Sequence, residues 1–234
     1  MATGAGVPGG ATGAGGNRDA GPAEGPGGNG SGAAGDAGQP RLPGDGLAAP
    51  GGRIRPWVWV SDEEVLPTPV FKVIRRSVIS PKDGRVKAFT VVSAPSWVNI
   101  MAFDRDRRVV LVRQYRHGSR SFSLELPGGI MDEGEEPLGA ALRELAEETG
   151  YSAGRAEILL SVNPNPALFG NSITTVIAWD AVRTSGTSFD ENEEAESVLL
   201  TLDELEKAYR EGGFCHALMV APIGYFLAVR DRYL

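Results

Sequence analysis

Three glutamates stand close together in the segment "RELAEETG", which covers residues 143–150. Because each residue of an α-helix advances by about 100°, Glu144, Glu147 and Glu148 would share one helix face. Like charges four residues apart destabilise a helix by about a few tenths of a kcal/mol. Carboxylates at this spacing can instead converge on a hard divalent cation such as Mg²⁺, which takes oxygen ligands. A charged run is also typical of a solvated helix face, so the cluster alone leaves both interpretations open.

Further residues at fixed distances surround this cluster. The segment matches the pattern G-x5-E-x7-R-E-U-x-E-E-x-G, in which U is an apolar residue, here Leu145. The seven matching residues are Gly129, Glu135, Arg143, Glu144, Glu147, Glu148 and Gly150. In a chain of this composition, seven matches at fixed spacing would arise by chance about once in 10⁵. A solvated face therefore does not account for the segment.

This pattern resembles the signature of the Nudix hydrolases, a superfamily that acts on nucleoside diphosphates linked to another group. The resemblance covers about residues 54–234 in general organisation, and it is closest to the ADP-ribose and nucleotide-sugar pyrophosphatase branch. One departure is Tyr151, where the pattern usually has an aliphatic residue. The resemblance implies Mg²⁺-dependent hydrolysis of a pyrophosphate bond, with Mn²⁺ as a substitute ion. The products would be a nucleoside monophosphate and a sugar phosphate.

The resemblance also implies which groups hold the metal. Glu144 and Glu148 would be the main ligands, and Glu147 would join them or hold a metal-bound water. Gly128, just before the pattern, would offer its backbone carbonyl. Glu135 would orient or supplement the site from the loop that precedes the helix.

Two further roles complete the expected catalytic group. Arg143 stands four residues before Glu147 and would hold that carboxylate rather than contact the substrate. A proton acceptor is expected from the acidic loop "FDENEEAE", residues 189–196, because relatives that cleave ADP-ribose carry it there. The resemblance indicates Glu191 first and Glu193 second. A solvated acidic loop is the alternative interpretation.

Several residues outside the pattern are candidates for substrate binding. Arg113 and Arg116, in "VRQYRHG", could neutralise phosphate charge, or they could simply keep a strand edge soluble. Trp57, Trp59 and Trp97 are candidates for stacking on a nucleobase, and packing in the core or in a dimer interface is the alternative. Trp57 and Trp59 alternate on a strand and so share one face, which is either a platform for a nucleobase or an interface. Asn171 could hydrogen-bond a hydroxyl or an amide, or it could cap the following strand.

The segment after the helix contains residues that relate to the choice of substrate. Pro166 lies 16 residues after Gly150, as does the proline that marks ADP-ribose cleavage in the family. Ala167 and Asn171 stand where that branch often has glycine and glutamate, so ADP-ribose and other nucleoside diphosphate sugars both stay open. The alternatives are a dinucleotide coenzyme, a dinucleotide polyphosphate, a modified nucleoside triphosphate, or a non-catalytic domain that senses nucleotides.

The composition narrows the classes of partner and metal site. The 234-residue chain has a net charge of −7 and a pI near 5.0, which argues against a nucleic-acid partner. Cys215 is the only cysteine, so no internal disulfide can form and a cytoplasmic location suits the chain. One cysteine and two histidines cannot build the usual zinc site, so a metal must be held by oxygen. The apolar run at 217–229 is shorter than the roughly 18 residues of a membrane span, which predicts a buried helix and no membrane partner.

The chain divides into a tail and a body. Residues 1–52 contain 19 of the 32 glycines and no aromatic residue, which predicts a disordered tail. Residues 53–234 form the expected Nudix domain. Its first part, 53–95, is a strand extension, and its second part, 96–234, is the catalytic core.

The body carries signals for both strands and helices. Pro137 and Gly150 bracket a predicted helix. Its apolar face, which is expected to be buried against the sheet, consists of Leu138, Ala141, Leu142 and Leu145. Two helices are expected near the C-terminus, and Thr201 with Glu204 could form a capping box at the start of the first. The fold class is therefore α+β, and the resemblance implies an α/β/α sandwich with a mixed β-sheet and an N-terminal antiparallel strand extension. By the same resemblance, these N-terminal strands would pair two subunits into a homodimer.

Overall fold

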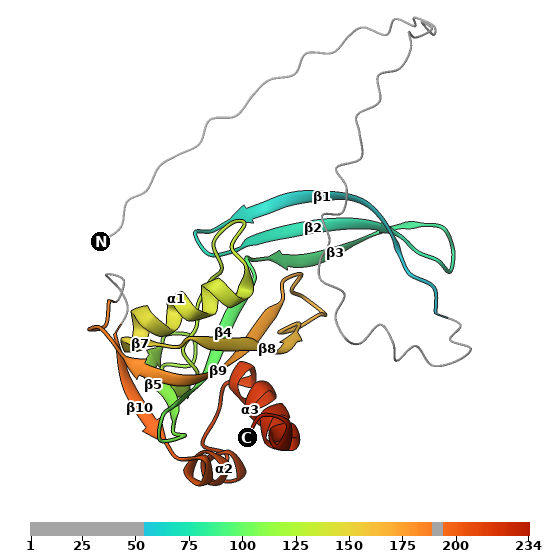
Figure 1. The fold of residues 1–234 in the computed structure, drawn as a ribbon. Coiled ribbons are helices and arrows are strands. Elements are labelled where there is room, and N and C mark those ends of the chain that lie inside the picture. Colours follow the sequence, from blue (N-terminus) through green and yellow to red (C-terminus); the bar gives the residue numbers. More distant parts are fainter. Residues whose placement is uncertain (1–53, 189–193) are drawn as a thin grey trace, which may run out of the picture. The chain divides into compact units, whose positions relative to one another are not determined.

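The computed structural model describes residues 54–188 and 194–234. The predicted tail, residues 1–52, lies outside the described residues, and so do the predicted proton acceptors Glu191 and Glu193. In the described ranges the chain forms two β-sheets and three α-helices, whose order is shown in Figure 1.

The first sheet is built from the predicted N-terminal strands. These are β1 (Val58–Pro67), β2 (Lys72–Ile79) and β3 (Val86–Ser93). They pair antiparallel in the order β1-β2-β3, which confirms the expected antiparallel arrangement. Val92 of β3 ties this sheet to a later segment, because its N–H donates to the carbonyl of Leu168 at 2.8 Å. Its carbonyl accepts from the N–H of Gly170 at 3.3 Å.

The second sheet holds the remaining strands. They are β4 (Trp97–Asp104), β5 (Val109–Arg116), β6 (Ser121–Glu125), β7 (Tyr151–Ser152), β8 (Arg155–Val162), β9 (Ile173–Arg183) and β10 (Ala195–Leu200). The central order is β10-β5-β4-β9-β7, while β6 pairs with β5 and β8 pairs with β9. The β4–β9 pair is parallel and the other pairs are antiparallel, so the sheet is mixed, as expected.

Helices cover both faces of this mixed sheet (Figure 1). Side chains of β4 alternate between the faces, so that Val98, Ile100 and Ala102 join one core cluster while Met101 and Phe103 join the other. The first cluster is completed by α1 (Pro137–Thr149), and the second by α2 (Leu202–Arg210) and α3 (Ala217–Val229). This arrangement confirms the predicted α/β/α sandwich.

The capping signals in the sequence are found at the helix ends, but one residue predicted to lie on a buried helix face is exposed. Thr201 and Glu204 form the expected capping box of α2. The prediction that Leu138 is buried was wrong, because this side chain is 37% exposed. Ala141 and Leu145 are buried as predicted, together with Ala140, and the small side chains of the two alanines let α1 lie close to the sheet.

Across the described part of the chain, no helix has both the length and the apolar character needed to cross a membrane.

Candidate active site

Helix α1 positions the glutamates and is closed by a glycine. Pro137 occupies the first turn, and Gly150 at the C-cap has a left-handed conformation, with φ of 73°. A Cβ atom at Gly150 would lie 2.3 Å from the carbonyl oxygen of Ser185. Both the conformation and the close approach therefore require glycine at this position.

Arg143 is the centre of a network of carboxylates on the exposed side of α1. Its Nη1 donates to Oε1 of Glu144 and to Oε2 of Glu147, both at 2.9 Å. Its Nε and Nη2 donate to the two carboxylate oxygens of Glu135, at 3.1 and 3.0 Å. The expected contact between Arg143 and Glu147 is confirmed, and Glu135 reaches the same guanidinium from the loop ahead of the helix.

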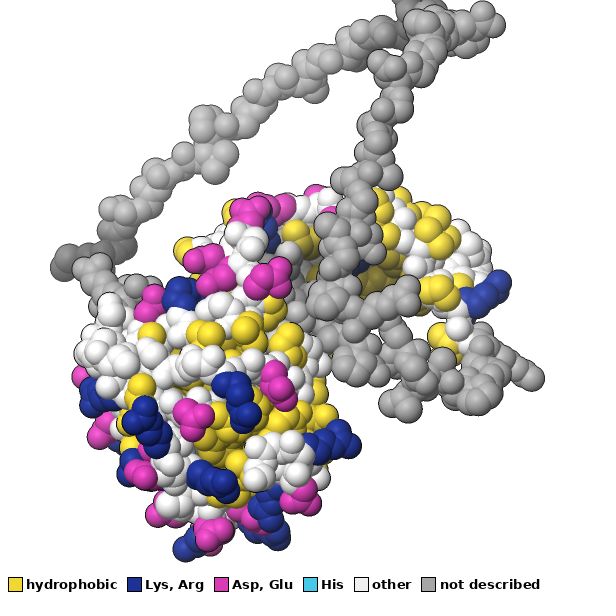
Figure 2. All heavy atoms as spheres, in the orientation of Figure 1, with side chains coloured by type: hydrophobic (Ala, Val, Ile, Leu, Met, Phe, Trp, Pro, Cys, Tyr) yellow, Lys and Arg dark blue, Asp and Glu magenta, His cyan; other side chains and the backbone are white. Residues whose placement is uncertain are grey.

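Within the network, the pKa values of Glu135 and Arg143 are shifted in the direction that favours their ion pair. Hydrogen bonds from Arg143 hold the pKa of the Glu135 carboxyl below its usual range. Hydrogen bonding to Glu135, with Glu144 and Glu147 nearby, raises the pKa of the Arg143 guanidinium. The guanidinium therefore stays charged and offsets the repulsion between the carboxylates. Figure 2 shows further acidic side chains over the loop that precedes α1.

Glu148 lies on the inner side of the helix, apart from this network. Its side chain is 8% exposed, and its Oε2 accepts a hydrogen bond of 2.9 Å from the N–H of Gly128. The role expected for the backbone carbonyl of Gly128 as a metal ligand stays a prediction. The amide contact places Glu148 against the loop at 127–130.

Two glycines make this loop fit against its neighbours. A Cβ atom at Gly128 would lie 2.2 Å from the carbonyl oxygen of Val98 in β4. A Cβ atom at Gly129 would lie 2.5 Å from Oε1 of Glu144. The missing side chains therefore let the loop lie on β4 and leave room for the Glu144 carboxylate beside the backbone.

These residues fit a divalent cation by their chemistry. The donors are carboxylate oxygens, which suit a hard ion such as Mg²⁺ or Mn²⁺, and the space beside Gly129 would be filled by any Cβ atom. Within the residues that the structure describes, no three acidic, histidine or cysteine side chains form a ready metal-binding group. The position of Arg143 accounts for this, because its guanidinium lies between the carboxylates of Glu135, Glu144 and Glu147.

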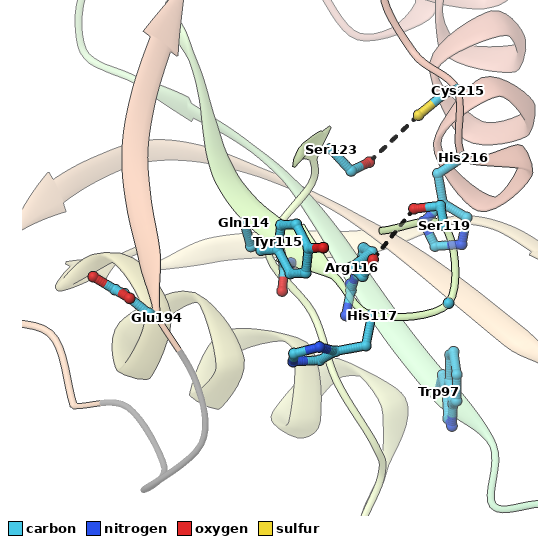
Figure 3. A pocket seen from close by; sticks show the side chains of 11 residues that line it. Trp97, Gln114, Tyr115, Arg116, His117, Ser119, Ser123, Glu194, Cys215 and His216 are labelled. Carbon is cyan, nitrogen blue, oxygen red and sulfur yellow. Dashed lines mark hydrogen bonds between the residues drawn. The ribbon is translucent and has the colours of Figure 1, made fainter. Parts of the chain in front are cut away.

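A cavity of about 670 Å³ opens at the ends of β5 and α3 (Figure 3). Its lining residues are Trp97, Gln114, Tyr115, Arg116, His117, Gly118, Ser119, Ser123, Glu194, Cys215 and His216. Trp97 connects the cavity to the pattern, because it forms a bridge with Ile130, the residue after Gly129. The volume is in the range of small-molecule sites, which is about 300–1,000 Å³.

The two candidate arginines lie in different surroundings. Arg116 lines the cavity and pairs with the buried Glu125, donating from Nε to Oε1 at 2.8 Å and from Nη2 to Oε2 at 2.7 Å. Arg113 instead lies over the ring of Phe122, 4.2 Å from its centroid, and 3.8 Å from the carboxylate of Glu196. Arg116 is therefore the arginine that the structure places beside the cavity.

The tryptophan candidates of the N-terminal segment are both exposed. Trp57 packs edge-on against Phe89 with ring centroids 5.4 Å apart, and Trp59 donates from Nε1 to Oδ1 of Asp62 at 3.2 Å. Neither lines the cavity described above. An interface and a nucleobase platform both stay open for this pair, while Trp97 is the tryptophan that reaches the cavity.

Asn171 has a structural role in the described residues. Its Nδ2 donates to the carbonyl of Pro95 at 2.8 Å, and the side chain is 6% exposed. Its Oδ1 is buried without a partner among the described residues. The amide therefore links the start of β9 to the segment before β4, and a contact with substrate stays a prediction.

Two polar residues at the cavity were not singled out from the sequence. Glu125 has a neighbouring leucine on each side in "LELPGG", which hides its charge within an apolar strand signal. His216 precedes the apolar run of α3, and nothing in its immediate sequence indicates a partner. Their contact joins positions 91 residues apart, so only the fold could reveal it.

The chain is similar to known proteins in sequence and in fold. The family model described as the NUDIX domain matches residues 94–217. A Mycobacterium tuberculosis protein named ADP-ribose pyrophosphatase is 31% identical over 163 residues, covering 68% of this chain and 78% of that protein. A Bacillus methanolicus protein named methanol dehydrogenase activator is 30% identical over 144 residues, covering 61% of this chain and 78% of its own length. A solved structure titled as an ADP compounds hydrolase has a TM-score of 0.65 and 25% identity, covering 76% of this chain and 95% of that one.

Proposed function

The chain belongs to the Nudix family, and from this premise we propose that it is a pyrophosphatase for a nucleoside diphosphate linked to a sugar. The substrate would be ADP-ribose or a related compound, cleaved to a nucleoside monophosphate and a sugar phosphate. Relatives whose names refer to ADP-ribose or ADP compounds support this choice. Nudix hydrolases generally use divalent metal ions, and we propose Mg²⁺ for this chain, with Mn²⁺ as a substitute.

One observation carries the proposal. Glu144, Glu147 and Glu148 stand on a single helix, and Gly129 leaves room for the Glu144 carboxylate beside the backbone. Carboxylates crowded on one helix repel each other, and such a group of oxygen donors is suited to a divalent cation. A nearby cavity that holds Arg116 supplies space for the phosphorylated substrate.

Each part of the site has a distinct task in this proposal. Glu144 and Glu148 would hold the cation, with Glu147 beside them. A divalent cation bound there supplies neutralisation of the pyrophosphate charge and lowers the pKa of water. Arg143 holds Glu135, Glu144 and Glu147 in fixed positions before the substrate binds. Arg116 would face a phosphate, since its guanidinium is kept in place by Glu125.

The proton of the attacking water needs an acceptor. We propose Glu191 or Glu193 for this role, in the acidic loop that joins β9 to β10. Glu194, the next residue, lines the cavity, which supports a location near the substrate. A carboxylate acts as a general base when it comes within hydrogen-bond reach of the water.

We also propose that the sheet of β1, β2 and β3 pairs two copies of the chain. It carries exposed apolar side chains at Trp57, Val58, Trp59, Val60, Val65, Leu66, Val86 and Phe89. Apolar groups that gather on a surface mark interaction sites. A second copy would cover them, and Trp57 or Trp59 could then stack on a nucleobase at the same place.

A substrate panel tests the proposed function. ADP-ribose, another ADP-sugar, a dinucleotide coenzyme, a dinucleotide polyphosphate and a nucleoside triphosphate would each be incubated with Mg²⁺ or Mn²⁺, and the products identified by chromatography. The proposal expects the nucleoside monophosphate and sugar phosphate from the ADP-sugars at the highest kcat/KM. A clear preference for dinucleotides or triphosphates would contradict the assigned substrate class.

A further inference from the structure

The buried carboxylate of Glu125 contacts two side chains that line the cavity. Glu125 is only 1% exposed, yet it receives two hydrogen bonds from Arg116 of β5. His216, which precedes α3, reaches the same carboxylate, with its Nδ1 3.0 Å from Oε2. Figure 3 shows Arg116 and His216 bordering one pocket from different elements. Glu125 therefore fixes the positions of both side chains relative to each other.

The charge on Glu125 determines which nitrogen of His216 carries a hydrogen. Burial alone would raise the pKa of the Glu125 carboxyl, but hydrogen bonds from Arg116 and His216 outweigh burial and lower the pKa to about 2. The carboxylate is therefore ionised at neutral pH and can only accept hydrogen bonds. Nδ1 of His216 therefore donates to it, and in the tautomer that carries its hydrogen on Nδ1 the acceptor is Nε2.

The acceptor nitrogen is turned toward the cavity. In an imidazole ring Nε2 lies away from the partner of Nδ1, and here that partner is the buried Glu125. The His216 side chain is 32% exposed and lines the cavity. The lining of the cavity also includes the neutral polar side chains of Gln114, Ser119 and Ser123. This part of the cavity is therefore suited to a ligand with hydroxyl groups.

We propose that His216 is a specificity-determining residue that accepts a hydrogen bond through Nε2 from a hydroxyl of the sugar half of the substrate. The inference rests on the proposed function and deepens it. A nitrogen lone pair repels a phosphate oxygen but accepts from a hydroxyl, whereas the permanent charge of Arg116 suits a phosphate. The two side chains held by Glu125 thus divide the recognition of sugar and phosphate between them.

Two substrates and two variants separate this role from a structural one. ADP-ribose and the ethyl ester of ADP share adenosine and both phosphates, but the ester lacks the second sugar. In His216→Asn, the side-chain NH₂ lies at the position of Nδ1 and can still donate to Glu125. The shorter side chain has no atom at the position of Nε2. In His216→Gln, the longer side chain places a polar group near Nε2. Kinetics of the full-length wild type and both variants would be measured on both compounds, together with melting temperatures.

The proposal expects His216→Asn to raise KM for ADP-ribose about tenfold, as loss of one hydrogen bond does, and to leave KM for the ethyl ester unchanged. His216→Gln should bring KM for ADP-ribose most of the way back to the wild-type value. Equal effects on the two compounds, or none on either, would overturn the role of His216 while leaving the proposed function intact. If the wild type hydrolyses neither compound with Mg²⁺ or Mn²⁺, the proposed function fails and this inference fails with it.

Discussion

Arg143 holds Glu135 through two parallel hydrogen bonds, from Nε to Oε1 at 3.1 Å and from Nη2 to Oε2 at 3.0 Å. The pair links the loop that precedes α1 to the exposed face of this helix. On that face the guanidinium of Arg143 also donates to Glu144 and Glu147. Only a planar fork with several donors can satisfy carboxylates in this way. The arginine of the sequence pattern is therefore a positioning residue.

We predict that Arg143→Lys lowers kcat/KM for ADP-ribose about tenfold or more, because an ammonium cannot hold three carboxylates in fixed directions. The pairs are partly exposed, so the loss of stability should be small, about 1 kcal/mol or less. Arg210→Lys is a matched control, since Arg210 pairs with Glu206 at the same four-residue spacing on α2. Equal activities of the two variants in a steady-state assay would contradict the role of Arg143.

We predict that Gly129→Ala reduces activity while the protein stays folded. The added Cβ would lie 2.5 Å from Oε1 of Glu144, and the flexible carboxylate must move away from its place. Gly139→Ala, in a helix position with open space around the Cβ, should keep full activity and not lower the melting temperature. A Gly129→Ala variant with wild-type kcat and KM would show that the place of Glu144 is not critical.

The ion pair of Glu125 predicts a specific dependence of stability on pH. Its folded-state pKa of about 2 lies below the ordinary value of 4.5, so its contribution is present above about pH 4.5 and is lost as the pH falls toward 2. Urea unfolding of the wild type and Glu125→Gln would be compared at pH 5 and pH 3. The difference between their free energies of unfolding should shrink by about 2 kcal/mol, and a constant difference would contradict the assigned pKa.

The proposed pairing of two copies predicts a change of size on substitution. Trp59→Lys places a charge among the exposed apolar side chains of the N-terminal sheet and should convert a dimer into a monomer, because a charge in an apolar interface is costly. Ile158→Lys on β8 is the control, since Ile158 is similarly exposed outside that sheet. Size-exclusion chromatography with light scattering would distinguish the species. A monomeric wild type would contradict the pairing.

Much of the fold could be predicted because its signals are local. Pro137 and Gly150 mark the ends of α1, and Thr201 with Glu204 marks the start of α2. The four-residue spacing of Arg143 and Glu147 was enough to predict their contact. Such features depend on backbone geometry within a few turns, which the order of residues determines directly.

The remaining features depend on contacts between distant segments. Helix periodicity predicted a buried Leu138, but this side chain, in the first turn of α1, is 37% exposed. The partnership of Glu125 with His216 spans 91 residues and arises only when α3 lies beside β6. Likewise, Arg113 and Arg116 look alike in the sequence, and only the fold separates the arginine beside the cavity from the one stacked on Phe122.

Binding of a divalent cation to the wild type and to Glu148→Gln tests the central claim most directly. The amide oxygen of glutamine can still accept from the N–H of Gly128, so the fold should persist, as circular dichroism would verify. With Mn²⁺ as the titrant and no nucleotide present, the wild type should bind the ion while Glu148→Gln binds at least tenfold more weakly, and in a separate assay with ADP-ribose and Mn²⁺ this variant should lose hydrolysis. Glu157→Gln, at an exposed carboxylate on β8, should match the wild type. Unchanged Mn²⁺ affinity and turnover in Glu148→Gln would contradict the claim that the glutamates of α1 hold the catalytic metal.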